Sequence, residues 1–207
     1  QPKTQLARWI IDPDHPLTAR VITNRLWQYH FGQGLVRTAN DFGANGDKPS
    51  HPQLLDFLAN EFVRRGWELK QLHRMLVSSR VFRQSSRVSE TQESRRLDPG
   101  NRWLARYSRR RLQAEELRDA MLSVSGQLHH VGGGPSVIAE VDQELIELLY
   151  KPTQWAVSKY PGDQARRSIY LIAKRNLRLP FMEVFDQPDL QTSCARREAS
   201  THAPQVL

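Results

Sequence analysis

The chain of 207 residues contains a single cysteine, Cys194. One thiol excludes an internal disulfide and a two-cysteine redox pair. Long apolar runs are also lacking, because the longest clusters, residues 145–150 and 169–173, fall far short of the roughly 20 residues that cross a bilayer. The sequence therefore predicts no membrane span.

Signature motifs of several protein classes are missing as well. There is no G-x-S-x-G pentapeptide, no complete P-loop and no C-x-x-C-H motif for covalent haem attachment. The triplet DFG at residues 41–43 lacks the other motifs that give it meaning in kinases. An EF-hand beginning at Asp41 would need ligands where Gly43 and Pro52 stand. The sequence thus identifies no reaction, and whether the chain is an enzyme stays open.

Charge of one sign is in excess, with 30 basic and 22 acidic residues and a formal net charge of +8. Such a balance favours polyanionic partners such as nucleic acid, an anionic polysaccharide or a membrane surface. Acidic residues are interleaved with the basic ones, however, as in residues 109–119, where Arg111 and Glu115 share a helical face. This interleaving argues against nucleic acid as the principal partner.

What the sequence does contain is helical periodicity. Apolar residues recur at steps of three and four, which predicts a mainly α, helical bundle-like domain with a small β element near residues 168–175. The predicted helices lie within residues 6–12, 17–31, 51–65, 67–82 and 110–128, and the last is predicted to be the longest. Helical character is weak in residues 141–150.

Two parts are predicted on either side of a polar connection. Residues 1–82 form an N-terminal helical part with a polar loop at residues 32–50, and residues 102–207 form a C-terminal helical part. Residues 83–101 are almost free of apolar side chains and are predicted to be an exposed connection.

Candidate site residues concentrate around the polar loop. On the helix before it, Arg20, Asn24, Trp27 and Phe31 form one stripe, and the polar members are expected to reach into the loop. The glycines of the loop are predicted to meet unusual backbone angles, and its Asn and Asp residues to bond neighbouring amides. The full candidate polar cluster is Arg20, Asn24, His30, Asp41, His51, Arg118 and Asp119.

A transition metal is the alternative use of the same loop. Imidazole and carboxylate groups from His30, Asp41, Asp47 and His51 are suitable ligands. Their spacing matches no recognised short motif, so we assign no metal site and prefer the structural role. An anion site is predicted instead at four basic residues, Arg109, Arg110, Lys174 and Arg175.

Several long motifs resemble those of a known family. LTARVITNRLWQYHFG, DPGNRWLARYSRRR, GGGPS, RRSIYLIAKRN and FMEVFDQPDLQTSCARREAS occur here in order along the chain. They resemble the planctomycete-specific domain family (PSD-one), an uncharacterised family found at the C-terminal end of exported proteins with cytochrome c modules. The resemblance implies a chain truncated at both ends, a periplasmic or cell-surface location, and haem in an adjoining domain but no cofactor in this chain.

Three functions remain open from the sequence. The first is an accessory interaction module that docks upstream cytochrome-type domains of the same polypeptide or an anionic glycan. The second is a hydrolase acting on a polysaccharide or ester, with a site at the loop of residues 30–52. The third is a nucleic-acid-binding domain, to which the basic and aromatic residues 102–111 and 166–178 are suited.

Overall fold

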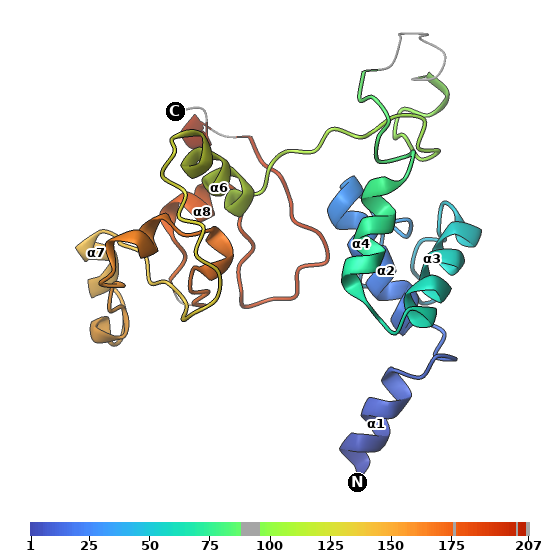
Figure 1. Ribbon diagram of the computed structural model, residues 1–207, viewed down its shortest axis with the longest axis horizontal. Coiled ribbons are helices and arrows are strands. Elements are labelled where there is room, and N and C mark those ends of the chain that lie inside the picture. The colour runs from blue at the N-terminus through green and yellow to red at the C-terminus, as the bar shows by residue number, and fades with distance from the viewer. Residues whose placement is uncertain (88–95, 176, 202, 206–207) are drawn as a thin grey trace. The chain divides into compact units, whose positions relative to one another are not determined.

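The computed structural model describes residues 1–87, 96–175, 177–201 and 203–205 (Figure 1). The chain divides into two compact units, Gln1–Arg110 and Arg111–Leu207. Taken as a whole the structure is mainly helical, which confirms the predicted mainly α class. Within the described ranges no helix combines the length and apolar character needed to span a bilayer.

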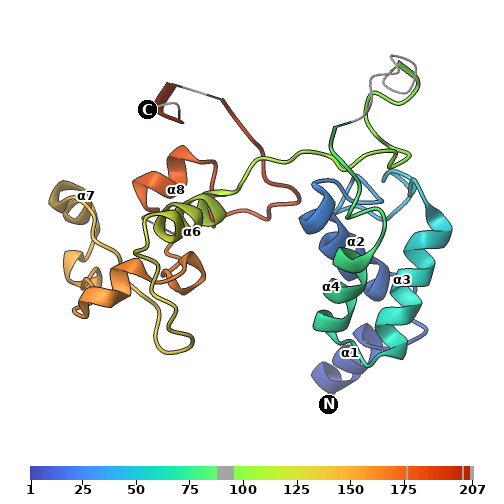
Figure 2. The same cartoon turned by 45° about the horizontal axis from the view of Figure 1, so that its top comes forward.

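Four α-helices of the first unit lie wholly within the described residues. They are α1 (Pro2–Ile10), α2 (Thr18–Phe31), α3 (Pro52–Arg64) and α4 (Leu69–Ser78). The last three fall in segments where a helix was predicted, and α1 overlaps the predicted segment 6–12 but begins four residues earlier. Helices α2, α3 and α4 pack against one another in both views (Figure 1 and Figure 2). Helix α1 has no buried residue, and none of its residues belongs to the apolar core of this unit.

The core of the first unit forms because each of the three packed helices has an apolar stripe at helical spacing. Its side chains are all nearly inaccessible to solvent, and several come from the end of α2 and the residues just after it. The buried members are Leu26, Trp27, Phe31, Leu35, Val36, Leu55, Leu58, Phe62, Leu72 and Leu76. This core fixes where the polar loop leaves α2 and where it enters α3.

The second unit has shorter helices. They are α6 (Ala114–Val124), α7 (Gln143–Glu147) and α8 (Pro180–Val184), together with the 3₁₀ turns η1 (Pro152–Gln154), η2 (Pro161–Ala165), η3 (Ser168–Tyr170) and η4 (Ala203–Gln205). A small apolar core joins Ile146, Leu149 and Trp155.

The prediction that residues 110–128 form the longest helix is wrong. Helix α6 has 11 residues, and α2 has 14. A capping box between Gln113 and Glu116 starts α6 late, and Gly126 adopts a left-handed conformation with φ of 71° just beyond its end. Its apolar stripe is also largely solvent-exposed, since Val124 is 88% exposed.

The predicted β element consists of isolated bridges rather than a strand. Val137 pairs with Leu171 in parallel and Lys174 with Leu177 in antiparallel fashion. The β-branched residues of the segment are interrupted by the η3 turn at Ser168–Tyr170, which leaves too few consecutive extended residues for a ladder.

The predicted connection at residues 83–101 is described only in part. Residues 88–95 lie outside the described residues. Residues 96–101 end in a turn in which the Asn101 N–H donates to the Asp98 carbonyl over 3.1 Å. After Asn101, Leu104 and Tyr107 pack on the edge of the core of the first unit.

Candidate functional site

The polar loop after α2 is held to that helix by one buried amide. The Asn24 side chain is inaccessible to solvent; its Nδ2 donates to the Val36 carbonyl over 2.9 Å, and its Oδ1 accepts from the Val36 N–H over 2.8 Å. Both backbone groups are thereby satisfied away from water. Asn24 therefore does reach into the loop, as its place on the helical stripe predicted.

Hydroxyl and glycine residues fix the rest of the loop. Thr38 Oγ1 donates to the Asp41 carbonyl over 2.7 Å and accepts from the Asp47 N–H over 2.9 Å. A Cβ atom at Gly46 would lie 2.2 Å from the Asp41 carbonyl oxygen, and one at Gly34 would lie 2.6 Å from Asn24 Nδ2. At both positions another part of the loop or helix occupies the space that a side chain would need, so only glycine fits there.

The prediction that all the loop glycines meet unusual backbone angles is therefore wrong. Within the loop and its boundary, only Gly32 has a positive φ, of 82°, where it ends α2. Gly34 and Gly46 are required because another part of the chain occupies the space of their missing side chain.

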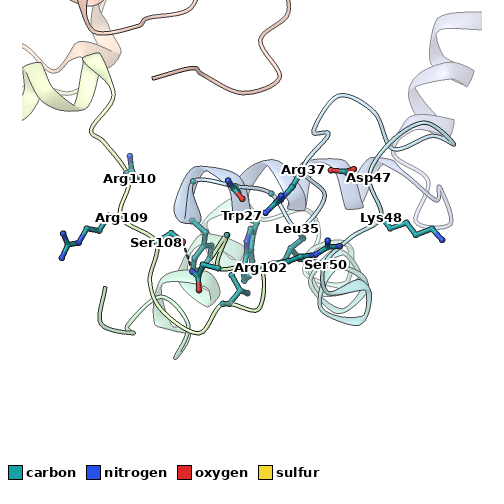
Figure 3. Close-up of a pocket in the computed structure, with 17 residues that line it drawn as sticks. Trp27, Leu35, Arg37, Asp47, Lys48, Ser50, Arg102, Ser108, Arg109 and Arg110 are labelled. Carbon is teal, nitrogen blue, oxygen red and sulfur yellow. Dashed lines mark hydrogen bonds between the residues drawn. The ribbon is translucent and has the colours of Figure 1, made fainter. Parts of the chain in front are cut away.

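A pocket of about 400 Å³ opens between this loop and residues 100–110. Its inner wall includes the buried side chains of Trp27, Phe31 and Leu35, and the Trp27 and Phe31 rings stack with centroids 4.1 Å apart. Figure 3 shows Trp27 and Leu35 at the centre, with labelled charged residues around them. The volume falls within the range of about 300 to 1,000 Å³ typical of small-ligand sites.

The charged lining of the pocket is strongly one-sided. It contains five cationic side chains and one carboxylate, which are Arg37, Lys48, Arg102, Arg109, Arg110 and Asp47. No hydrogen bond or ion pair joins the side chains of Arg37, Lys48 or Arg102 to any residue that the structure describes. Arg37 does interact electrostatically with Asp98, but the lining keeps a net positive charge over an apolar wall, and such a surface attracts an anion.

Arg37 and Arg102 are the central cations of this lining. Arg37 points towards Trp27, whereas Lys48 and Arg109 point away from the centre (Figure 3). The Arg37 guanidinium also lies over the opposite wall, since a Cβ atom at Gly100 would be 3.3 Å from its Nη2. Two planar guanidinium groups can each bind a carboxylate, sulfate or phosphate through paired hydrogen bonds.

The segment that carries Arg102 is rigidly built. The Asp98 carboxylate accepts from the N–H groups of Arg102 and Trp103, both over 2.7 Å. Although desolvation opposes the change, these two hydrogen bonds and the nearby Arg106 and Arg37 lower the pKa of Asp98. The carboxylate therefore stays ionised and keeps the turn closed at neutral pH.

The predicted anion residues are divided between the two units. Arg109 and Arg110 line the pocket of the first unit, and Arg109 Nε donates to Ser86 Oγ over 3.5 Å. In the second unit, Lys174 donates to the Gln154 carbonyl over 2.9 Å and lies 5.4 Å from the centre of the Trp155 ring, while Arg175 is exposed.

The predicted polar cluster also distributes over separate contacts. Arg20 pairs with Asp56 of α3 at 2.6 Å, and Asp41 accepts from the Gly43 N–H at 2.8 Å within its own loop. In the second unit, Arg118 donates to Ser168 Oγ over 3.2 Å, and Asp119 accepts from the Ser168 N–H over 2.7 Å. These groups each have a local structural partner.

His51 contacts the residue before it. Its Nδ1 lies 3.0 Å from Ser50 Oγ, and Ser50 lines the pocket. A serine beside an imidazole is one part of a nucleophile and base arrangement. No hydrogen bond to a described residue orients the second nitrogen of His51, so the pair lacks the third member that such sites use. The described residues also contain no group of three or more metal-ligating side chains.

His30 forms a histidine pair across the core edge. Its Nε2 lies 2.8 Å from His73 Nδ1 of α4, and the His30 carbonyl accepts from the Tyr107 hydroxyl over 2.8 Å. Burial, and after it the nearby His73 and Arg110, lower the pKa of His30. The folded chain thus favours the neutral imidazole.

Acidification is expected to destabilise the first unit through His30. Because its folded pKa is lowered, the unfolded chain binds the proton first as the pH falls below about 6.5. The free energy of unfolding should therefore fall with pH from that point, more steeply for the unmodified chain than for His30→Gln. Urea unfolding at about pH 7.5 and about pH 5.5 measures both slopes, and parallel slopes would contradict the assignment.

Sequence reasoning missed Arg37, Lys48 and Arg102 as members of the site. Arg37 and Lys48 lie in the polar loop and Arg102 lies beyond the predicted connection, so no spacing along the chain relates them. The available signal was the run of cations in residues 102–110, since the loop itself carries equal numbers of cations and carboxylates.

A family model described as "Protein of unknown function (DUF1553)", with the short name PSD1, matches residues 2–207. Comparison with curated proteins and with solved structures found no match. The family match spans both units, and its description gives no activity.

Proposed function

The chain belongs to the PSD1 family of proteins of unknown function (DUF1553), and on that premise we propose that it is an accessory interaction module that binds an anionic partner in the basic pocket of its first unit. The observation that carries the proposal is the charge of the lining, which contains five cationic side chains and one carboxylate, with Arg37 and Arg102 at its centre. Holding like charges together costs free energy that a bound anion removes.

Binding is a better fit to the pocket than hydrolysis. Arg37 and Arg102 lie at its centre, and the polar residues of the loop are engaged with the backbone around them. The Ser50 and His51 pair is a fragment of a hydrolytic site without an orienting partner among the described contacts. The pocket therefore contains more side chains suited to binding an anion than side chains suited to catalysing hydrolysis.

Removing the central cations is expected to weaken binding of anions by about tenfold or more, because hydrogen bonds to charged groups contribute about 1.5–3 kcal/mol each. The variant is Arg37→Ser with Arg102→Ser, and the probes are sodium sulfate and sulfated dextran, measured by calorimetry at low and high salt. High salt should weaken binding of the dextran by the unmodified chain.

A matched control changes the net charge by the same amount. Lys70→Ser with Arg74→Ser removes two exposed cations from α4, and neither residue lines the pocket. This control should bind within about twofold of the unmodified chain. Equal losses of affinity in both double variants would show that net charge, and not the pocket, governs binding. If the unmodified chain binds neither sulfate nor sulfated dextran, the proposal is refuted.

A further inference from the structure

An exposed tryptophan stands at the rim of the basic pocket. Trp103 is 65% exposed, and its two chain neighbours, Arg102 and Leu104, both line the pocket. Its ring meets the His51 ring at a centroid distance of 6.1 Å and an angle of 79°, and His51 follows Ser50 of the lining. The indole itself is not part of the lining, but it lies between two lining residues in the chain and presents an apolar surface to solvent.

The backbone around Trp103 is held in a strained conformation that keeps the ring outside the core. Leu104 has a φ of 58°, a left-handed value that costs a branched residue roughly 1 kcal/mol or more, and its side chain packs on the core of the first unit. Asn101, also left-handed with a φ of 48°, donates from Nδ2 to the Arg106 carbonyl and to Ser108 Oγ, both over 2.8 Å. The turn therefore places the tryptophan side chain outward.

We infer that the pocket and Trp103 together bind an acidic glycan, with a carboxylate or sulfate held by Arg37 and Arg102 and a sugar ring stacked on the Trp103 indole. This inference rests on the proposed function and adds the class of ligand. Sugar rings have an apolar face of C–H groups, which loses contact with water when it covers an aromatic face and meets the negative side of its quadrupole.

The arrangement fits a glycan better than the other polyanions. An acidic face of a protein would use the cations, but it offers a ring to the indole only where an aromatic or proline side chain lies beside a carboxylate, whereas an acidic glycan carries a sugar ring next to each charge. A single-stranded nucleic acid needs several aromatic side chains along a charged groove, because successive bases stack. The described ring contacts place one exposed aromatic, Trp103, beside the compact pocket.

Replacing Trp103 tests the inference separately from the charge. Trp103→Ala should lower affinity for an oligogalacturonate by about tenfold, in line with the roughly 1–3 kcal/mol of an aromatic stacking contact, and leave affinity for sodium sulfate within about twofold. Trp9→Ala is the matched control, since Trp9 is 60% exposed in α1 and also meets a histidine ring, that of His15. The control should leave both affinities within about twofold of the unmodified chain.

The remaining outcomes separate the two proposals. A neutral maltooligosaccharide of the same length should bind at least tenfold more weakly than the oligogalacturonate. Tighter binding of oligothymidylate or polyglutamate, or an unchanged oligogalacturonate affinity in Trp103→Ala, would overturn the glycan assignment while the anion pocket stands. If neither sulfate nor any of these polyanions binds, the proposed function fails together with the inference.

Discussion

Replacing Asn24 by alanine is expected to lower the free energy of unfolding of the first unit by about 3 kcal/mol, since each buried group left without a partner costs about 1–3 kcal/mol. The substitution removes both hydrogen bonds to Val36, whose N–H and carbonyl are buried with it. Val36 is part of the apolar core, so the loss also loosens the start of the loop.

Two measurements test this expectation. Urea unfolding gives the change in stability, and hydrogen exchange at the Val36 amide should become faster by orders of magnitude as its protection is lost. Asn60→Ala on the exposed side of α3 is the control, and it should change stability by less than about 0.5 kcal/mol. Unchanged protection at Val36 would show that Asn24 does not hold the loop.

The same residue illustrates what the sequence could predict. Asn24 lies on a helical stripe with Trp27 and Phe31, and the 3.6-residue period is enough to infer that it faces inward and reaches the loop. Arg20 belongs to the same stripe but pairs with Asp56 of α3 instead. Periodicity predicts the face of a helix, and tertiary packing selects the partner on that face.

The pocket could not be predicted from helical periodicity. Its walls come from the loop after α2 and from residues 100–110, and Arg37 and Arg102 meet there because Leu104 and Tyr107 pack against the core. Left-handed backbone at Asn101 and Leu104 directs this approach, and neither residue type requires that conformation. Contacts between distant segments that depend on such local choices cannot be inferred from spacing along one chain.

Helix lengths in the second unit were limited for a related reason. The apolar residues of segment 110–128 continue at helical spacing, but the capping box at Gln113 and the left-handed Gly126 delimit α6 within it. In the predicted β element, β-branched residues indicated a strand. Among the described residues, the segment around Val137 pairs with it through one isolated parallel bridge, between Val137 and Leu171. Propensity was overridden in both places by the neighbouring turn.

Gly46→Ala is expected to have the other large effect, with a loss of about 3 kcal/mol or more in the free energy of unfolding of the first unit. The new Cβ atom would lie 2.2 Å from the Asp41 carbonyl oxygen and 3.1 Å from Thr38 Oγ1. Since the first of these atoms belongs to the backbone, the whole turn has to move, and the hydrogen bond between the Asp47 N–H and Thr38 Oγ1 breaks with it.

Gly43→Ala is the matched control within the same loop. Its Cβ atom would meet only the Asp41 Oδ1 atom, at 3.2 Å, and a side-chain oxygen can rotate away, so the loss should stay below about 1 kcal/mol. Because Asp47 and Lys48 directly follow Gly46 on the pocket wall, Gly46→Ala should also weaken sulfate binding, whereas Gly43→Ala should leave it within about twofold. If the two variants unfold at the same urea concentration, the loop tolerates movement at Gly46. In that case residues 100–110 alone would provide the rigid wall that the anion pocket requires.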